Sequence, residues 1–203
     1  DLLRMAMTCK ELHSSLPEAL HHVRCLDFSG MQNLQRLPFN LPQQLKMLVC
    51  SHTAISTLPP QLPASLTHLD LSHNLSFSTL PPQLPASLTS LSCNYTSISS
   101  LPQPLPSLTS LSCSNAHFRS LPQLPATLIT LNCRLNVLHS LPQPLPPSLT
   151  SLNFSGTRIS SLPPQLSSSS LTSLNCSCTF ISTLPQLPAT LTSLTCNNTD
   201  IRT

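Results

Sequence analysis

The sequence predicts a repeat solenoid, in which the chain winds into stacked turns that present short parallel β-strands on one concave face. The main observation is a cassette that recurs at steps of 20 to 22 residues, L-x-x-L-x-C-x-x-T-x-I-x-x-L-P. Two further observations are an alternation of apolar and polar residues at the start of each cassette and a proline-rich segment at its end. The first apolar residue of the cassette falls at Val23, Leu45, Leu66, Leu88, Leu108, Leu128, Leu149, Leu171 and Leu191.

Each cassette begins with a predicted strand. In residues 88–93, alternation places Leu91 and Cys93 on one face and Ser90 and Ser92 on the other. The proline-rich segment that follows cannot be regular helix, because proline lacks an amide donor and disfavours helix in the residue before it. We therefore expect an extended, polyproline-like convex side, with the leucines between its prolines closing the core.

The cassette resembles the leucine-rich repeat, whose core is L-x-x-L-x-L-x-x-N with a period of 20 to 29 residues. The resemblance implies one curved array of about nine repeats over residues 23–203, the last of them incomplete. Two departures are visible. One extra residue near Leu75 predicts a bulge, and the serines of 167–170, which replace Leu-Pro-Ala, predict a looser convex loop that leaves a groove unfilled.

Composition excludes several classes of partner. The net charge is +3 without a basic run, so nucleic acid is not indicated, and no apolar stretch is long enough to span a bilayer. Neither a catalytic constellation nor a glycine-rich phosphate loop is present. We therefore predict no enzymatic activity and no cofactor. A monomer is expected.

Nine cysteines raise the question of disulfides or metal binding. Most of them share one cassette position with Leu71, Phe28 and Phe154, and a position that accepts Cys, Leu or Phe is a core position. Their side chains run parallel on adjacent strands, which opposes disulfide geometry. We therefore predict buried, reduced thiols and no metal site. The six cysteines of this column are Cys50, Cys93, Cys113, Cys133, Cys176 and Cys196.

The exposed strand face is varied near its N-terminal end and is mostly Ser, Thr and Asn farther along. Protein recognition needs larger or charged anchors, so the partner site is predicted in the first three repeats. The predicted binding residues are Lys46, Met47, His52, His68, Asp70 and His73. The rival location, farther along the array, would use Tyr95, Arg134 and Leu135.

Residues 1–22 precede the repeats and are predicted to form a helical cap, with apolar residues stepping by three and four. The run from Asp1 to Leu12, DLLRMAMTCKEL, resembles the second half of an F-box. That resemblance implies a Skp-type adaptor bound through residues 1–16, and repeats that recruit a substrate for a cytoplasmic ubiquitin ligase. The first half of the motif is not in this sequence.

The repeats support a different alternative. The segments 121–131 and 184–194 read LPQLPATLxxL and are similar to the short repeats of secreted bacterial effectors of the IpaH and YopM kind. This resemblance implies an effector repeat region acting in host cytoplasm, without a catalytic domain of its own. A third possibility is a structural protein that uses its Ser and Thr columns as a flat hydroxyl array.

Overall fold

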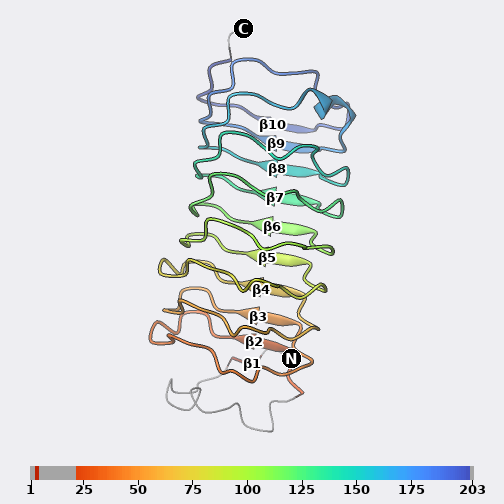
Figure 1. The fold of residues 1–203 in the computed structure, drawn as a ribbon. Coiled ribbons are helices and arrows are strands. Elements are labelled where there is room, and N and C mark those ends of the chain that lie inside the picture. The colour runs from red at the N-terminus through yellow and green to blue at the C-terminus, as the bar shows by residue number, and fades with distance from the viewer. Residues whose placement is uncertain (1–2, 5–21, 202–203) are drawn as a thin grey trace.

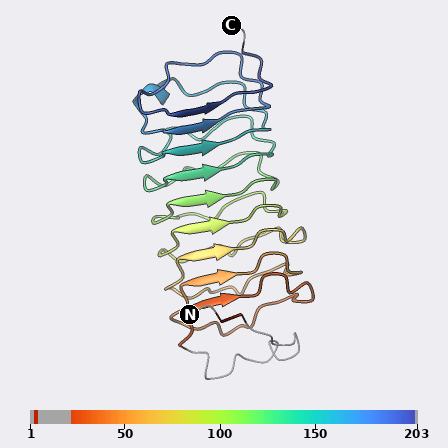
Figure 2. The ribbon, with the colours of Figure 1, turned by 180° about the vertical axis from the view of Figure 1, so that it is seen from behind.

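The computed structural model describes residues 3–4 and 22–201 of the chain. Within them, ten short strands form a single parallel sheet in chain order. Figure 1 shows the strands stacked along one axis, and Figure 2, from behind, shows all arrows pointing the same way. The strands are β1 (Leu3–Arg4), β2 (Cys25–Asp27), β3 (Met47–Val49), β4 (His68–Asp70), β5 (Ser90–Ser92), β6 (Ser110–Ser112), β7 (Thr130–Asn132), β8 (Ser151–Asn153), β9 (Ser173–Asn175) and β10 (Ser193–Thr195). The predicted parallel-strand solenoid is confirmed.

Each strand from β2 to β9 buries its middle residue and turns its first and third residues outward. The middle leucines pair in register, as Leu48 with Leu69 and Leu69 with Leu91, so each turn adds one leucine to a continuous column. These side chains are at most 2% exposed from β2 to β9. On β10 the equivalent Leu194 is 39% exposed, because no described turn covers it. The first and third residues of β2 to β10 are called the strand face below.

The cysteine column lies inside the core, as predicted. Cys50, Cys93, Cys113, Cys133 and Cys176 are all fully buried, while Cys196 in the last turn is partly exposed. Burial raises the pKa of the Cys93 and Cys133 thiols to about 12, because the apolar core disfavours the thiolate. These groups therefore remain protonated and act as packing side chains.

Hydroxyl groups join each turn to the one before it. The threonine that precedes each of several strands donates to a backbone carbonyl of the preceding turn, for example Thr89 Oγ1 to Thr67 O at 3.0 Å and Thr109 Oγ1 to Thr89 O at 3.0 Å. Serines and threonines at the end of the proline-rich segments, which form the return side of each turn, also donate to the preceding turn. For example, Ser87 Oγ donates to Leu66 O. Because these donors are already used inside the fold, the threonine column is a structural clamp, which weighs against a role as a surface hydroxyl array.

The proline-rich return side is extended, as predicted, and its leucines close the core. Leu84, Leu105 and Leu124 are buried there. The expectation of a loose loop at 167–170 is wrong: residues Pro164–Ser168 form a short 3-10 helix, η3, and Ser169 Oγ donates to Leu166 O at 2.7 Å. Serine can satisfy local backbone carbonyls with its hydroxyl, which helps to order the end of this segment.

The predicted bulge near Leu75 is present. A tight turn absorbs the extra residue, since Phe77 N donates to Asn74 O at 2.9 Å. Phe77 stays fully buried, while Leu75 is 72% exposed. The extra residue is therefore pushed outward and the core column is kept.

The prediction of a helical cap is wrong at Leu3–Arg4. These two residues form β1 and pair in parallel with Leu26 and Asp27. The open edge of β2 carries unpaired backbone groups, and pairing them outweighs the helical spacing of the side chains at these two positions. The rest of the predicted cap and of the F-box-like run lies outside the described residues.

Candidate functional site

Three of the six predicted binding residues meet in one depression of the strand face. Met47 on β3 pairs with His68 on β4, and Val49 pairs with Asp70. The depression above them has a volume of about 210 Å³. We call it the acidic pocket; its lining is Met47, Leu48, Val49, His68, Leu69, Asp70, Ser90 and Ser92.

Local hydrogen bonds fix the polar side of the acidic pocket. Asp70 Oδ1 accepts a hydrogen bond from the backbone N–H of Ser72 at 2.9 Å, which orients the carboxylate at the end of the strand. His68 Nδ1 is hydrogen-bonded to Thr67 Oγ1 at 2.9 Å. Asp27 repeats the arrangement two strands away, accepting from Ser29 N at 2.8 Å. Both carboxylates therefore sit at the same end of their strands.

Lys46 is exposed and lies just before β3. It is three residues from Val49, so it is roughly 10 Å from the carboxylate end of the strand face. The predicted set is thus spread over both ends of β3 and β4, and Lys46 does not line the acidic pocket.

His52 and His73 form a separate cluster at the edge of the strand face, and Tyr95 joins them. The ring centroids of His52 and His73 are 4.0 Å apart with planes 10° from parallel, and those of His73 and Tyr95 are 4.6 Å apart at 15°. We call these three residues the ring stack. Rings at these spacings interact through stacked aromatic faces.

The backbone explains why these rings align. All three residues have left-handed φ, between 52° and 60°, at the position seven residues after the first leucine of their turns. The same position is left-handed in the following turns too, so every turn aims this side chain in the same direction. Tyr95 is seventh after Leu88, as His73 is after Leu66. The column of His52 and His73 therefore also contains Tyr95, which belongs to the rival location for the partner site.

The remaining rival residues lie two turns farther on. Arg134 is exposed and Leu135 is 48% exposed. Leu135 lies over the glycine of the next turn, where a Cβ at Gly156 would stand 2.7 Å from Leu135 Cδ2. This pair forms a packed contact at the edge of the strand face.

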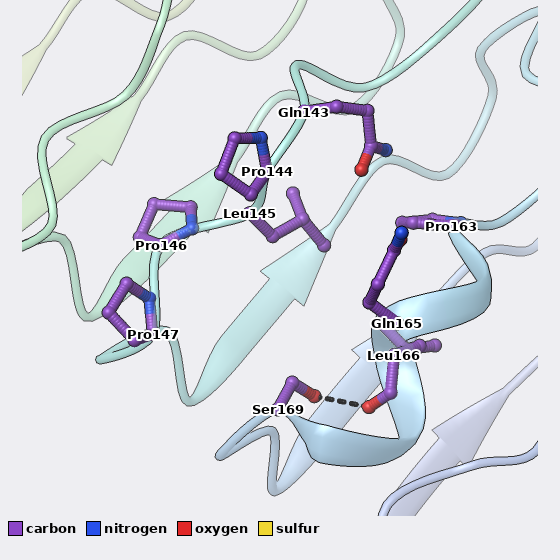
Figure 3. A pocket seen from close by; sticks show the side chains of 9 residues that line it. All are labelled: Gln143, Pro144, Leu145, Pro146, Pro147, Pro163, Gln165, Leu166 and Ser169. Atoms are coloured by element: carbon purple, nitrogen blue, oxygen red, sulfur yellow. Dashed lines mark hydrogen bonds between the residues drawn. The ribbon is translucent and has the colours of Figure 1, made fainter.

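A second depression, of about 200 Å³, opens on the return side between two adjacent turns. Figure 3 shows the rings of Pro144, Pro146 and Pro147 on one side and η3 on the other, with Ser169 hydrogen-bonded to Leu166. It lies where serine replaces the usual proline and alanine, so the unfilled groove predicted there is present. Its lining carries no charged side chain, and none of the predicted binding residues contributes to it.

Burial raises the pKa of the Cys50 thiol, which directly follows β3, and Asp70 and Asp27 raise it further. In residues 22–201, no group of three His, Cys, Asp or Glu side chains is arranged to hold a metal ion. The same part of the chain contains no helix with the length and apolar character needed to cross a bilayer.

Comparisons with known proteins agree with the fold. The family profile described as Leucine Rich repeats (2 copies) matches residues 147–189, and the profile described as Leucine Rich Repeat matches 65–86. No curated protein matches the chain. The chain therefore carries leucine-rich repeats, and this class of solenoid is typically a non-catalytic interaction scaffold.

Solved structures of bacterial effectors are similar to this solenoid. YopM from Yersinia enterocolitica WA-314 is 33% identical over 82% of this chain and 40% of that chain, with a TM-score of 0.65. YopM from Yersinia pestis, a leucine-rich effector protein, is 30% identical over 90% of this chain and 57% of that chain, with a TM-score of 0.71. A Shigella effector leucine-rich-repeat domain is 28% identical over 77% and 70%, with a TM-score of 0.66. This chain thus spans about half the length of the YopM chains that it resembles.

Proposed function

We propose that this chain is a non-catalytic protein-binding module of an effector-like protein, and that the strand face of its first repeats recruits the partner. The observation that carries the proposal is the concentration of large and charged side chains there. Met47, Val49, His68 and Asp70 surround a depression, and the ring stack adds three aromatic side chains in the turns that follow β3, β4 and β5. Interfaces take most of their binding energy from a few anchors of this kind.

The later strands offer little to a protein surface. From β6 to β9 the outward residues are Ser, Thr or Asn, and several are hydrogen-bonded within the face, such as Thr130 to Ser110 at 2.9 Å. Small hydroxyl and amide groups that already have partners bury little area on contact. This contrast supports placing the partner over the first three repeats, β2 to β4.

The similarity to YopM and to the Shigella effector domain supports a host-directed role in the cytoplasm of the target cell. An F-box-like role is the second candidate, favoured by the run from Asp1 to Leu12. Its docking surface would need the start of that run to be helical, whereas Leu3–Arg4 pair with β2. Co-purification of the full-length protein with a Skp-type adaptor would decide for the second candidate.

The experiment for the main proposal is selection of a phage-displayed random peptide library on the purified chain. His68→Ala combined with Asp70→Ala should remove capture of the selected peptides while the chain stays folded, because neither side chain is in the core. The matched control is Ser151→Ala with Asn153→Ala, which changes the same two positions on β8. Capture lost in the control and kept in the first variant would overturn the proposed location.

A further inference from the structure

The acidic pocket is bounded by two rows of side chains that run across the strands. The first row holds the first residues of β3 and β4, Met47 and His68, and the second row holds their third residues, Val49 and Asp70. Met47 and Val49 form an apolar wall on β3, and Asp70 with the serines of β5 forms a polar wall. The pocket is therefore apolar on one side and anionic on the other.

The size of the acidic pocket suits one side chain. Its volume of about 210 Å³ lies below the range of roughly 300 to 1,000 Å³ that is usual for small-molecule sites. A long side chain with an aliphatic stem and a polar head matches its two walls, since such side chains bury the stem on apolar surface and keep the charge at a polar end.

Within residues 22–201, no ion pair compensates the charge of Asp70 in the acidic pocket. Asp70 and Asp27 accept hydrogen bonds from backbone N–H groups and form no ion pair within residues 22–201. In the described part of the chain, the cations nearest in sequence, Arg24 and Lys46, precede β2 and β3, at the other end of the strands from Asp70. The fields of both carboxylates overlap around β3, because each raises the pKa of the buried Cys50 thiol.

We propose that the acidic pocket binds an arginine or lysine side chain of the partner protein, with the aliphatic stem on Met47 and Val49 and the cation on Asp70. This proposal rests on the proposed function and specifies the type of partner side chain that the acidic pocket recognises. An ionised carboxylate accepts several hydrogen bonds, so Asp70 keeps acceptor capacity after the bond from Ser72. A charge-assisted hydrogen bond to a guanidinium or ammonium is stronger than a neutral one.

Other occupants fit less well. Asp27 and Asp70 are two strands apart, about 10 Å, so they cannot hold one metal ion together. An anionic side chain would face Asp70 without a compensating cation. A purely apolar side chain would cover the carboxylate and remove it from water without giving it a partner, which is costly.

The experiment is a titration of the ¹⁵N-labelled full chain with N-acetyl-arginine methylamide, followed by amide chemical shifts. Shifts are expected at β3 to β5. The citrulline analogue, which has the same shape without charge, should bind about tenfold more weakly. Binding of the arginine probe should weaken as salt rises from about 0.01 M to about 0.1 M, because the Debye length falls from ~30 Å to ~10 Å.

Two variants test the assignment of the carboxylate. Asp70→Asn keeps the shape of the side chain and should reduce arginine binding to the level of citrulline. Asp27→Asn removes a charge that does not line the acidic pocket and should have a smaller effect. Equal binding of arginine and citrulline, or a larger loss in Asp27→Asn than in Asp70→Asn, would overturn the proposal.

The peptide selection separates this proposal from the proposed function. Selected peptides should share one arginine or lysine, and peptides selected on Asp70→Asn should not. Peptides that bind β3 to β5 without a shared basic residue would overturn the inference and leave the proposed function standing. Selected peptides whose binding shifts no amide of the strand face would overturn both.

Discussion

Gly156 occupies the left-handed position of its turn, with φ of 68°, and lies beneath Leu135. In Gly156→Ala, the left-handed backbone should destabilise the folded chain by ~1–2 kcal/mol. Alanine also lowers the conformational entropy of the unfolded chain, which offsets this loss by ~0.4–1 kcal/mol. The new Cβ would stand 2.7 Å from Leu135 Cδ2, so that side chain must retreat by about 1 Å to reach ordinary contact. Leu135 is 48% exposed, and losing part of its remaining burial should cost about 1 kcal/mol. The expected total is a destabilisation of about 1.5–2 kcal/mol.

Gly30→Ala is the matched control, because Gly30 has φ of 78° and no atom within 4 Å of the added Cβ. Only the backbone contribution remains there, so we expect a loss of about 0.5–1 kcal/mol. Urea unfolding measures both, provided that the slope m is unchanged. In a Leu135→Ala background, the cost of Gly156→Ala should fall to that of the control. If the two glycine substitutions cost the same in the wild-type background, the contact with Leu135 contributes nothing and the reasoning is refuted.

Three further predictions concern the core thiols and the ring stack. Cys113→Ser should destabilise the chain by ~1–3 kcal/mol, because a buried hydroxyl would lack a partner, and Cys113→Ala should cost less; the opposite order in urea unfolding would contradict the packing role. At pH 8 a thiol reagent should label exposed Cys178 quickly and Cys93 only on unfolding, since burial raises the pKa of the Cys93 thiol to about 12; fast labelling of both in the native state would disprove the burial. The chain has one tyrosine and no tryptophan, so its fluorescence should change in His73→Ala, which removes the ring on Tyr95, and stay the same when a histidine outside the ring stack is replaced.

The repeating part of the fold could be predicted because every cassette contains the same alternation of apolar and polar residues and the same spacing. The segment 88–93 was expected to be a strand, and β5 spans Ser90–Ser92 within it. Alternation sets which residues enter the core, and the constant period places equivalent residues beside one another. The cysteine column followed from these two facts alone, since Cys93 and Cys113 had to occupy the same place as Leu71.

The parts that were missed depend on features that one cassette does not encode. Leu3–Arg4 form β1 because the sheet has an open edge, and an edge exists only at the end of the array. The turn η3 arises where serines replace prolines, so no neighbouring turn predicts it. For the acidic pocket, sequence spacing placed His68 and Asp70 on one strand, but the contribution of Val49 required the register of β3 against β4.

In the ring stack, the energy of the left-handed backbone can be compared with the energy of stacking between the side chains. His52, His73 and Tyr95 all hold a left-handed backbone, which costs a residue with a Cβ about 1–2 kcal/mol. Gly30 occupies the equivalent position of its turn. It has no Cβ, so a positive φ costs it little. The backbone therefore does not require rings at these turns. Stacking contributes about 0.5–1.5 kcal/mol for each of the two pairs, which does not exceed the strain of the three residues. Because the rings contribute little net stability, replacing them should change folding little, which is consistent with the proposal that the strand face of the first repeats contacts a partner.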